Sequence, residues 1–164
     1  MLLSRACEYG IQVMLYLHQH GGDRNVPVSE ISRKQGIPPS YLAKIVGQLA
    51  TEGLLVSRRG TGGGVRLARD STKMKLIDVV KAIDGPELSS RCIIGLPNCG
   101  TAAPCPFHDT WGPLREQVIA ALSSQSLASL MQGGSYRISR DGRRTRGVID
   151  LGVVPRSRKV RGAV

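Results

Sequence analysis

The sequence lacks several patterns that define large classes of protein. It has no apolar run of the about 20 residues that a helix needs to cross a bilayer. No Gly-Lys-Ser or Gly-Lys-Thr sequence completes a phosphate-binding loop. No catalytic Ser/His/Asp or paired-carboxylate arrangement can be recognised in the sequence. We therefore expect a cytoplasmic protein that neither enters a membrane nor acts as an enzyme.

Cysteine and acidic residues are both scarce. There are four cysteines, and 12 Asp and Glu oppose 23 Lys and Arg, which leaves a net charge of +11. This imbalance favours a polyanionic partner such as double-stranded DNA. Most of the excess falls in residues 132–164, which contain nine basic and two acidic residues and few large apolar ones. We expect that basic tail to be disordered and to add non-specific affinity for nucleic acid.

The spacing of apolar residues predicts a mainly α fold with a small β-hairpin. Repeats of three and four positions indicate helices, and two short β-type runs flank a glycine-rich tip. A helix pair followed by a hairpin is the order of a winged helix-turn-helix, which we expect to occupy residues 1–85. The predicted helices cover residues 4–19, 28–35, 40–52, 76–84, 109–122 and 127–131, and the predicted strands cover residues 54–58 and 65–68.

The second helix of the pair and the hairpin carry side chains suited to DNA. In such modules that helix enters the major groove, and arginine on a hairpin suits a narrow, electronegative groove. The glycines of the tip let the backbone turn and approach DNA closely. An ordinary pair of antiparallel helices would explain the two helices, but not the β-hairpin that follows them. The candidate DNA-binding residues are Ser40, Tyr41, Lys44, Arg58, Arg59, Gly60 and Arg66.

Three of the four cysteines lie close together with a histidine. Cys92, Cys99, Cys105 and His108 are separated by six, five and two residues. Thiolate and imidazole are the ligands that zinc and iron–sulfur clusters select, so residues 86–108 are predicted to form a metal-binding loop. Cys7, which lies in the first helix, is expected to be an inert packed thiol.

The residues of this loop leave several kinds of site open. A Cys3His set satisfies tetrahedral zinc, and two of the cysteines could instead form a disulfide on oxidation. The spacing is also close to that of Cys3His RNA-binding fingers. Such fingers interleave basic and aromatic side chains for base stacking, and residues 93–104 contain neither kind of side chain. An RNA-binding module is therefore the weakest of these alternatives.

Five short runs stand out beside the cysteine trio and its trailing histidine: Val28–Ser32, Gln35–Ile37, Ser40–Leu42, Gly53–Leu54 and Arg59–Gly64. Together these runs and the cysteine loop resemble the IscR/NsrR regulators of the Rrf2 family. The resemblance covers residues 1–131 and leaves the basic tail out. This chain has six residues between its first two cysteines where IscR has five, and Ala43 replaces an acidic residue of the IscR recognition helix.

The resemblance implies a homodimeric transcription factor with an iron–sulfur cluster, either 2Fe–2S or 4Fe–4S. Cys92, Cys99 and Cys105 would be cluster ligands, with His108 as the fourth and Glu8 as the alternative to it. We expect residues 109–131 to form the dimerisation region, with contacts along the stripe from Trp111 to Leu122. A two-fold dimer would place two recognition helices about one helical turn apart on a pseudo-palindromic operator.

Overall fold

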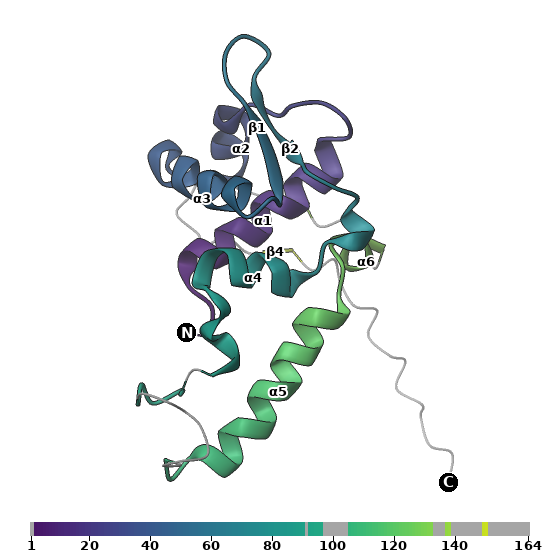
Figure 1. The fold of residues 1–164 in the computed structure, drawn as a ribbon. Coiled ribbons are helices and arrows are strands. Elements are labelled where there is room, and N and C mark those ends of the chain that lie inside the picture. The colour runs from purple at the N-terminus through teal and green to yellow at the C-terminus, as the bar shows by residue number, and fades with distance from the viewer. Residues whose placement is uncertain (1, 91, 97–104, 133–136, 139–148, 151–164) are drawn as a thin grey trace, which may run out of the picture.

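The computed structural model describes residues 2–90, 92–96, 105–132, 137–138 and 149–150. The predicted mainly α fold with one principal hairpin is confirmed, and Figure 1 shows its arrangement. The elements are α1 (Arg5–His20), α2 (Val28–Gln35), α3 (Pro39–Thr51), β1 (Leu55–Arg58), β2 (Gly64–Leu67), η1 (Ser71–Lys73), α4 (Leu76–Asp84), η2 (Pro86–Ser89), α5 (His108–Ser124), α6 (Leu127–Gln132), β3 (Arg137–Ile138) and β4 (Ile149–Asp150).

Helix α1 runs through the centre of the main core. Its start is capped by Ser4, whose hydroxyl accepts a hydrogen bond from the Cys7 backbone N–H at 3.0 Å. One face of α1 then buries Val13, Met14 and Leu17 against α2, α3, the hairpin and α6. Burying a side chain of this size contributes about 1.5–3 kcal/mol relative to leaving it exposed. The main core therefore joins every element of the winged helix-turn-helix.

The turn between α2 and α3 is fixed by backbone conformation and one buried hydroxyl. Gly36 ends α2 in the left-handed region at φ 55°, which glycine adopts without the steric cost of a Cβ. The Ser32 hydroxyl donates to the Ile37 carbonyl at 2.7 Å, and Ile37 is buried in the main core. Pro39 occupies the first turn of α3, where no backbone N–H is needed. The predicted helix-turn-helix is thus present, with α3 beginning one residue earlier than expected.

The hairpin follows directly from the end of α3. The N–H groups of Gly53 and Leu54 donate to the carbonyls of Ala50 and Leu49 at 3.1 and 2.9 Å, which closes the helix with a Schellman turn. Because Leu54 belongs to this turn, β1 starts one residue later than predicted. Strands β1 and β2 pair antiparallel with Arg58 opposite Gly64. A Cβ on Gly64 would lie 2.4 Å from the Val26 carbonyl oxygen, so this glycine allows the hairpin to pack against the loop before α2.

Helix α5 extends away from the winged domain, as Figure 1 shows. Its C-terminal end is held to the body by a short β-bridge between Lys75 and Ser126 and by the Leu127 N–H, which donates to the Met74 carbonyl at 2.9 Å. Along α5 itself, Trp111 is the buried residue. The helix begins at His108, one residue before the predicted start. Most of the α5 surface is therefore uncovered in one chain.

Beyond Gln132, which ends α6, the basic tail is described only at β3 and β4, which pair antiparallel. These four residues form structure where the sequence predicts disorder, and for the rest of the tail that prediction lies outside the described residues. Within the described part of the chain, no helix combines the length and the apolar character needed to cross a membrane.

Candidate nucleic-acid interface and metal centre

The outer face of α3 presents the three predicted groove residues to solvent. Its inner face packs into the main core through Leu42, Ile45, Val46 and Leu49. The helical period then leaves Ser40, Tyr41 and Lys44 on the exposed side near the N-terminal end. These positions offer a hydroxyl, a phenol and an ammonium group to a groove.

Tyr41 has an aromatic neighbour that sequence analysis did not identify. Its ring lies edge-on to that of Tyr9 in α1, with ring centroids 6.0 Å apart and an interplanar angle of 80°. This T-shaped arrangement is a favoured one for aromatic pairs. Tyr41 remains 36% exposed, so it is held at one edge while staying accessible.

The hairpin projects its arginines away from the core. Because side chains alternate along a strand, the pairing register puts Arg58 and Arg66 on the face opposite buried Leu55 and Val65. Arg58 is exposed and Arg66 is half-buried. At the tip, Arg59 and Gly60 are exposed, and Gly60 takes φ 90° in a turn whose closing hydrogen bond joins Gly63 N–H to the Gly60 carbonyl.

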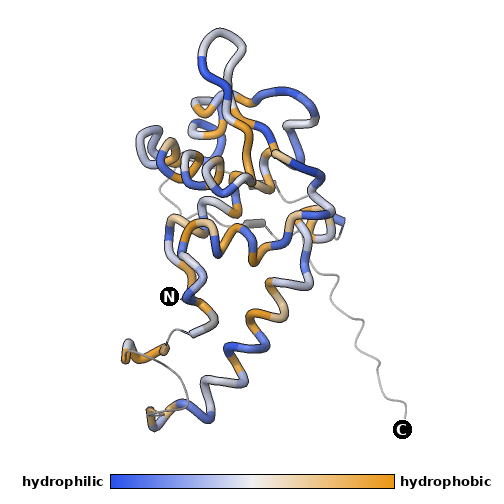
Figure 2. The backbone as a smooth tube through the Cα atoms, in the orientation of Figure 1, coloured by the Kyte–Doolittle hydropathy of each residue, from blue (hydrophilic) through white to orange (hydrophobic). Residues whose placement is uncertain are grey.

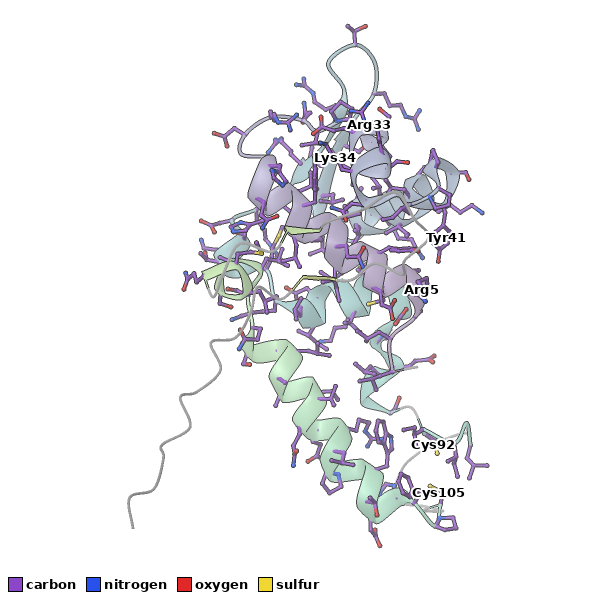
Figure 3. The ribbon with its side chains drawn as sticks, turned by 180° about the vertical axis from the view of Figure 1, so that it is seen from behind. Arg5, Arg33, Lys34, Tyr41, Cys92 and Cys105 are labelled. Carbon is purple, nitrogen blue, oxygen red and sulfur yellow. The ribbon has the colours of Figure 1, made fainter. Side chains whose placement is uncertain are left out.

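Two further basic residues lie beside this surface. Arg33 and Lys34 occupy the last turn of α2 and are both exposed. Figure 3 places them just below the hairpin. Basic residues in the last turn of the first helix of the pair were the signal that could have found them. They add positive charge in the region where phosphates would lie.

The described cysteines of the loop come together although they are far apart in sequence. The Sγ atoms of Cys92 and Cys105 are 3.8 Å apart, with Cys92 buried and Cys105 half-buried (Figure 3). A disulfide needs about 2.05 Å, so this distance is not that of a covalent bond. Two thiolates about 2.3 Å from one tetrahedral metal ion lie about 3.8 Å apart. The pair is therefore spaced as two ligands of a single metal would be.

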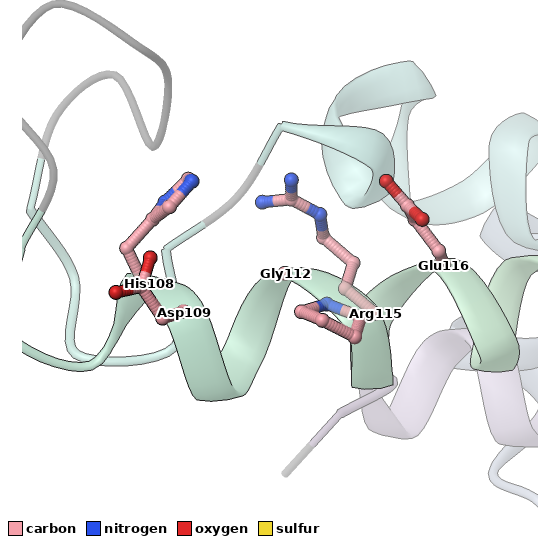
Figure 4. A pocket seen from close by; sticks show the side chains of 6 residues that line it. His108, Asp109, Gly112, Arg115 and Glu116 are labelled. Atoms are coloured by element: carbon pink, nitrogen blue, oxygen red, sulfur yellow. The ribbon is translucent and has the colours of Figure 1, made fainter.

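His108 lies next to this pair at the start of α5. Its backbone N–H donates to the Cys105 carbonyl at 2.9 Å, which connects the start of the helix to the cysteine. The imidazole is half-buried and lines a pocket of ≈ 280 Å³ with Arg115, on the same side of α5 (Figure 4). Among the described residues, the Nε and Nη1 atoms of Arg115 are buried without a hydrogen-bond partner.

The remaining predicted ligands have different outcomes. Cys99 lies outside the described residues, and within those residues no three metal-binding side chains come together. Glu8 lies in the first turn of α1, where its carboxylate pairs with Arg5 at 2.7 Å. Burial, followed by the nearby charges and a hydrogen bond to Asp84, raises the pKa of the Cys7 thiol to about 12. Cys7 is fully buried, which agrees with its predicted role as an inert packed thiol.

The exposed α3 face, the basic hairpin and the fold together define a winged helix-turn-helix regulator. Residues 3–133 match the Rrf2 family, described as iron-dependent transcriptional regulators. The chain belongs to the Rrf2 family, and it is an IscR-type transcriptional regulator. The resemblance seen in the sequence is thereby confirmed.

Named relatives agree with this assignment. The chain is 34% identical over 132 residues to the HTH-type transcriptional regulator IscR of Xenorhabdus nematophila, covering 80% of each chain. It is also 34% identical to IscR of Yersinia enterocolitica, covering 80% of this chain and 79% of that one.

Solved structures share the same fold. The IscR structure from T. potens has a TM-score of 0.63 at 25% identity, covering 79% of this chain and 85% of that one. The structure of CymR, the global cysteine regulator of B. subtilis, has a TM-score of 0.69 at 23% identity. That match covers 81% of this chain and 98% of CymR.

Proposed function

We propose that the chain is a homodimeric transcriptional regulator whose operator binding is controlled by an iron–sulfur cluster. The observation that carries this proposal is the 3.8 Å separation of the Cys92 and Cys105 sulfurs, with His108 tied to Cys105. In a member of a family of iron-dependent regulators, a paired thiolate site next to a winged helix-turn-helix supports metal-controlled DNA binding.

We assign the DNA contacts to two surfaces. Ser40, Tyr41 and Lys44 would enter the major groove on α3, and Arg58, Arg59, Gly60 and Arg66 would follow the backbone or the minor groove from the hairpin. The exposure of every one of these residues except half-buried Arg66 supports this assignment, and Arg33 and Lys34 are exposed as well. The latter two would contact phosphates without reading sequence.

The proposed dimer interface lies on α5 and the cysteine segment. Figure 2 shows orange, hydrophobic segments in this part of the backbone, and its large apolar side chains are between 41% and 56% exposed. Large apolar side chains left exposed in this way indicate an interaction site, and a two-fold axis would let each copy cover the other. These exposed residues are Ile93, Ile94, Leu96, Phe107 and Leu114.

Cys92, Cys99 and Cys105 would bind the cluster, with His108 as the fourth ligand. We rank His108 above Glu8 of the partner subunit, because a carboxylate is a harder ligand and Glu8 already pairs with Arg5 in its own chain. When bound, the cluster supplies a centre that oxidants, nitric oxide or iron shortage can alter. Ligation would order the segment between η2 and α5, and release would free it.

A second candidate is supported by the same sulfur separation. Zinc is tetrahedral and would accept two thiolates at this distance as readily as iron does. Without metal, the two thiols could instead form a disulfide, losing two protons and two electrons to an oxidant such as a peroxide. Either alternative keeps the DNA-binding function and changes the signal.

The test is to purify the full chain without oxygen and to measure its visible spectrum, its iron, sulfide and zinc contents, and its mass in solution. We expect visible absorption, matching iron and acid-labile sulfide, and a dimer. Colourless protein with one zinc per chain would overturn the cluster in favour of a structural metal. Protein that stays metal-free after reconstitution with iron and sulfide would favour the thiol switch.

A further inference from the structure

The last residue of α4 holds the first turn of α1. The Asp84 carboxylate accepts hydrogen bonds from the Ser4 backbone N–H at 2.9 Å and from the Ser4 hydroxyl, across 80 positions of sequence. The same hydroxyl accepts from the Cys7 N–H and so caps α1. The start of α1 is therefore fixed to the end of α4 by one carboxylate.

On one side, Asp84 leads directly to the cysteine segment. Gly85 turns the chain at φ 85° into η2, and Cys92 follows three residues after its end. Within η2, Leu88 packs with Cys7 of α1 in a small second core, which Ile119 and Leu122 of α5 flank. Movement of the cysteine segment or of α5 would therefore act on the region that Asp84 holds.

On the other side, the first turns of α1 reach the recognition helix. Tyr9 lies five residues after Ser4, and its ring meets the ring of Tyr41 edge-on. Since α1 is one continuous helix over these residues, a displacement of its capped end is carried to Tyr9. The Tyr41 ring is 36% exposed and rests against the Tyr9 ring, so a displacement of Tyr9 would change the support of Tyr41.

We infer that Asp84 is a positioning residue for DNA recognition: through Ser4 and Tyr9 it orients Tyr41, and it connects the cysteine segment to α3. This inference rests on the proposed function at one point, namely that Tyr41 contacts DNA. Its connection to the cysteine segment is a consequence of where Asp84 lies in the chain, at the end of α4 and two residues before η2.

The test is a double-mutant cycle on the metal-free full chain, with an operator fragment selected from genomic DNA. Asp84→Ala alone should weaken binding about 2- to 10-fold, the range that loss of one aromatic contact gives. In a Tyr41→Ala background the same change should have almost no effect. Asp23→Ala, which removes one exposed acidic group elsewhere, is the matched charge control and should not weaken binding.

Milder changes at two other positions keep the cycle interpretable if Asp84→Ala folds poorly. Ser4→Ala removes the hydroxyl but leaves the backbone N–H to donate to Asp84, and it should give a smaller loss of the same kind. Tyr9→Phe keeps the ring and should bind as the wild type does, whereas Tyr9→Leu should weaken binding. Additive effects of the Asp84 and Tyr41 changes, or equal effects of Tyr9→Phe and Tyr9→Leu, would overturn the inference.

The cluster provides a second readout for the same variants. If the wild type binds operator differently with and without its metal, Asp84→Ala should bring that affinity ratio closer to one while leaving metal content unchanged. An unchanged ratio would overturn the connection to the cysteine segment. A wild type that binds no metal would refute the proposed function, and the metal-free cycle would still decide whether Asp84 positions Tyr41.

Discussion

The winged domain and the arm formed by the cysteine segment and α5 are built differently. In the winged domain, α1 and α3 bury most of their apolar side chains in one continuous core. In the arm, Trp111 is the buried residue of a 17-residue helix, and Leu114 on the same helix is 47% exposed. The first region can hold its shape from its own packing, whereas the arm has little buried surface of its own.

This difference separates two tasks. A surface that reads DNA must keep its groups in fixed positions, which the core beneath α3 provides. A segment that responds to a signal must change shape at small cost, and such segments have few buried contacts. We therefore expect the arm to gain order from metal ligands and from a second copy, and the winged domain to keep its fold without either.

The largest expected effect is on metal binding in the arm. Cys105→Ala removes a thiolate 3.8 Å from Cys92, and it should abolish metal binding because the remaining ligands no longer complete the site. The free energy of unfolding of the winged domain should change little. Metal analysis and chemical denaturation measure the two quantities. The control is Cys7→Ala, which should keep the metal and lower stability, since Cys7 is fully buried and protonated.

Truncating a side chain of the main core should, in contrast, mainly lower the free energy of unfolding. Leu17→Ala in α1 should lower the free energy of unfolding by about 2–5 kcal/mol, because it leaves a cavity in the main core. Leu114→Ala on α5 removes the same atoms from a half-exposed position, so it should change the stability of the monomer much less. Denaturant titration at low protein concentration measures both. Equal losses would show that the arm is packed as tightly as the core.

The fold could be predicted well where local signals decide the structure. The bounds of α2 and α4 match the predicted ranges, because Gly36 and Gly85 follow them and stop each helix. The predicted first strand was one residue too long, since Leu54 is used to close α3. The short helices η1 and η2 were missed because they show no apolar period.

An arginine on the hairpin should have an intermediate effect. Arg59→Ala should weaken specific operator binding by about 1–3 kcal/mol, because it removes a cation from the exposed tip. The core is untouched, so metal content and stability should stay as in the wild type. Arg69→Ala removes the same charge from a residue paired with Asp78 at 3.3 Å, and it should affect binding less. Electrophoretic mobility shifts would compare them, and equal losses would reduce the role of Arg59 to net charge.

The candidate site could be predicted only in part. Side chains on one element, such as Ser40 and Lys44, follow from helical period and need no further information. The contact of Tyr9 with Tyr41 and that of Ser4 with Asp84 join elements that are far apart in sequence. Such contacts depend on how helices pack, which a pattern along one chain does not contain.

The smallest expected effect concerns an ion pair on the winged domain, where packing should outweigh charge. Hydrogen bonds from Arg24, at 2.9 Å, and from Tyr16 lower the pKa of the Glu30 carboxyl. Because its folded pKa is lowered, the ionised carboxylate stabilises the protein above the ordinary glutamate pKa of about 4.3. This contribution is lost as the pH falls through the folded pKa. Glu30→Gln should therefore cost about 0–1 kcal/mol at pH 7, less at high salt, and nothing in acid below the folded pKa. Denaturation of both proteins across pH measures this difference. A cost that persists in acid would mean that Glu30 acts through packing against Tyr16. The winged domain and the arm would then differ in their buried cores more than in their use of surface groups.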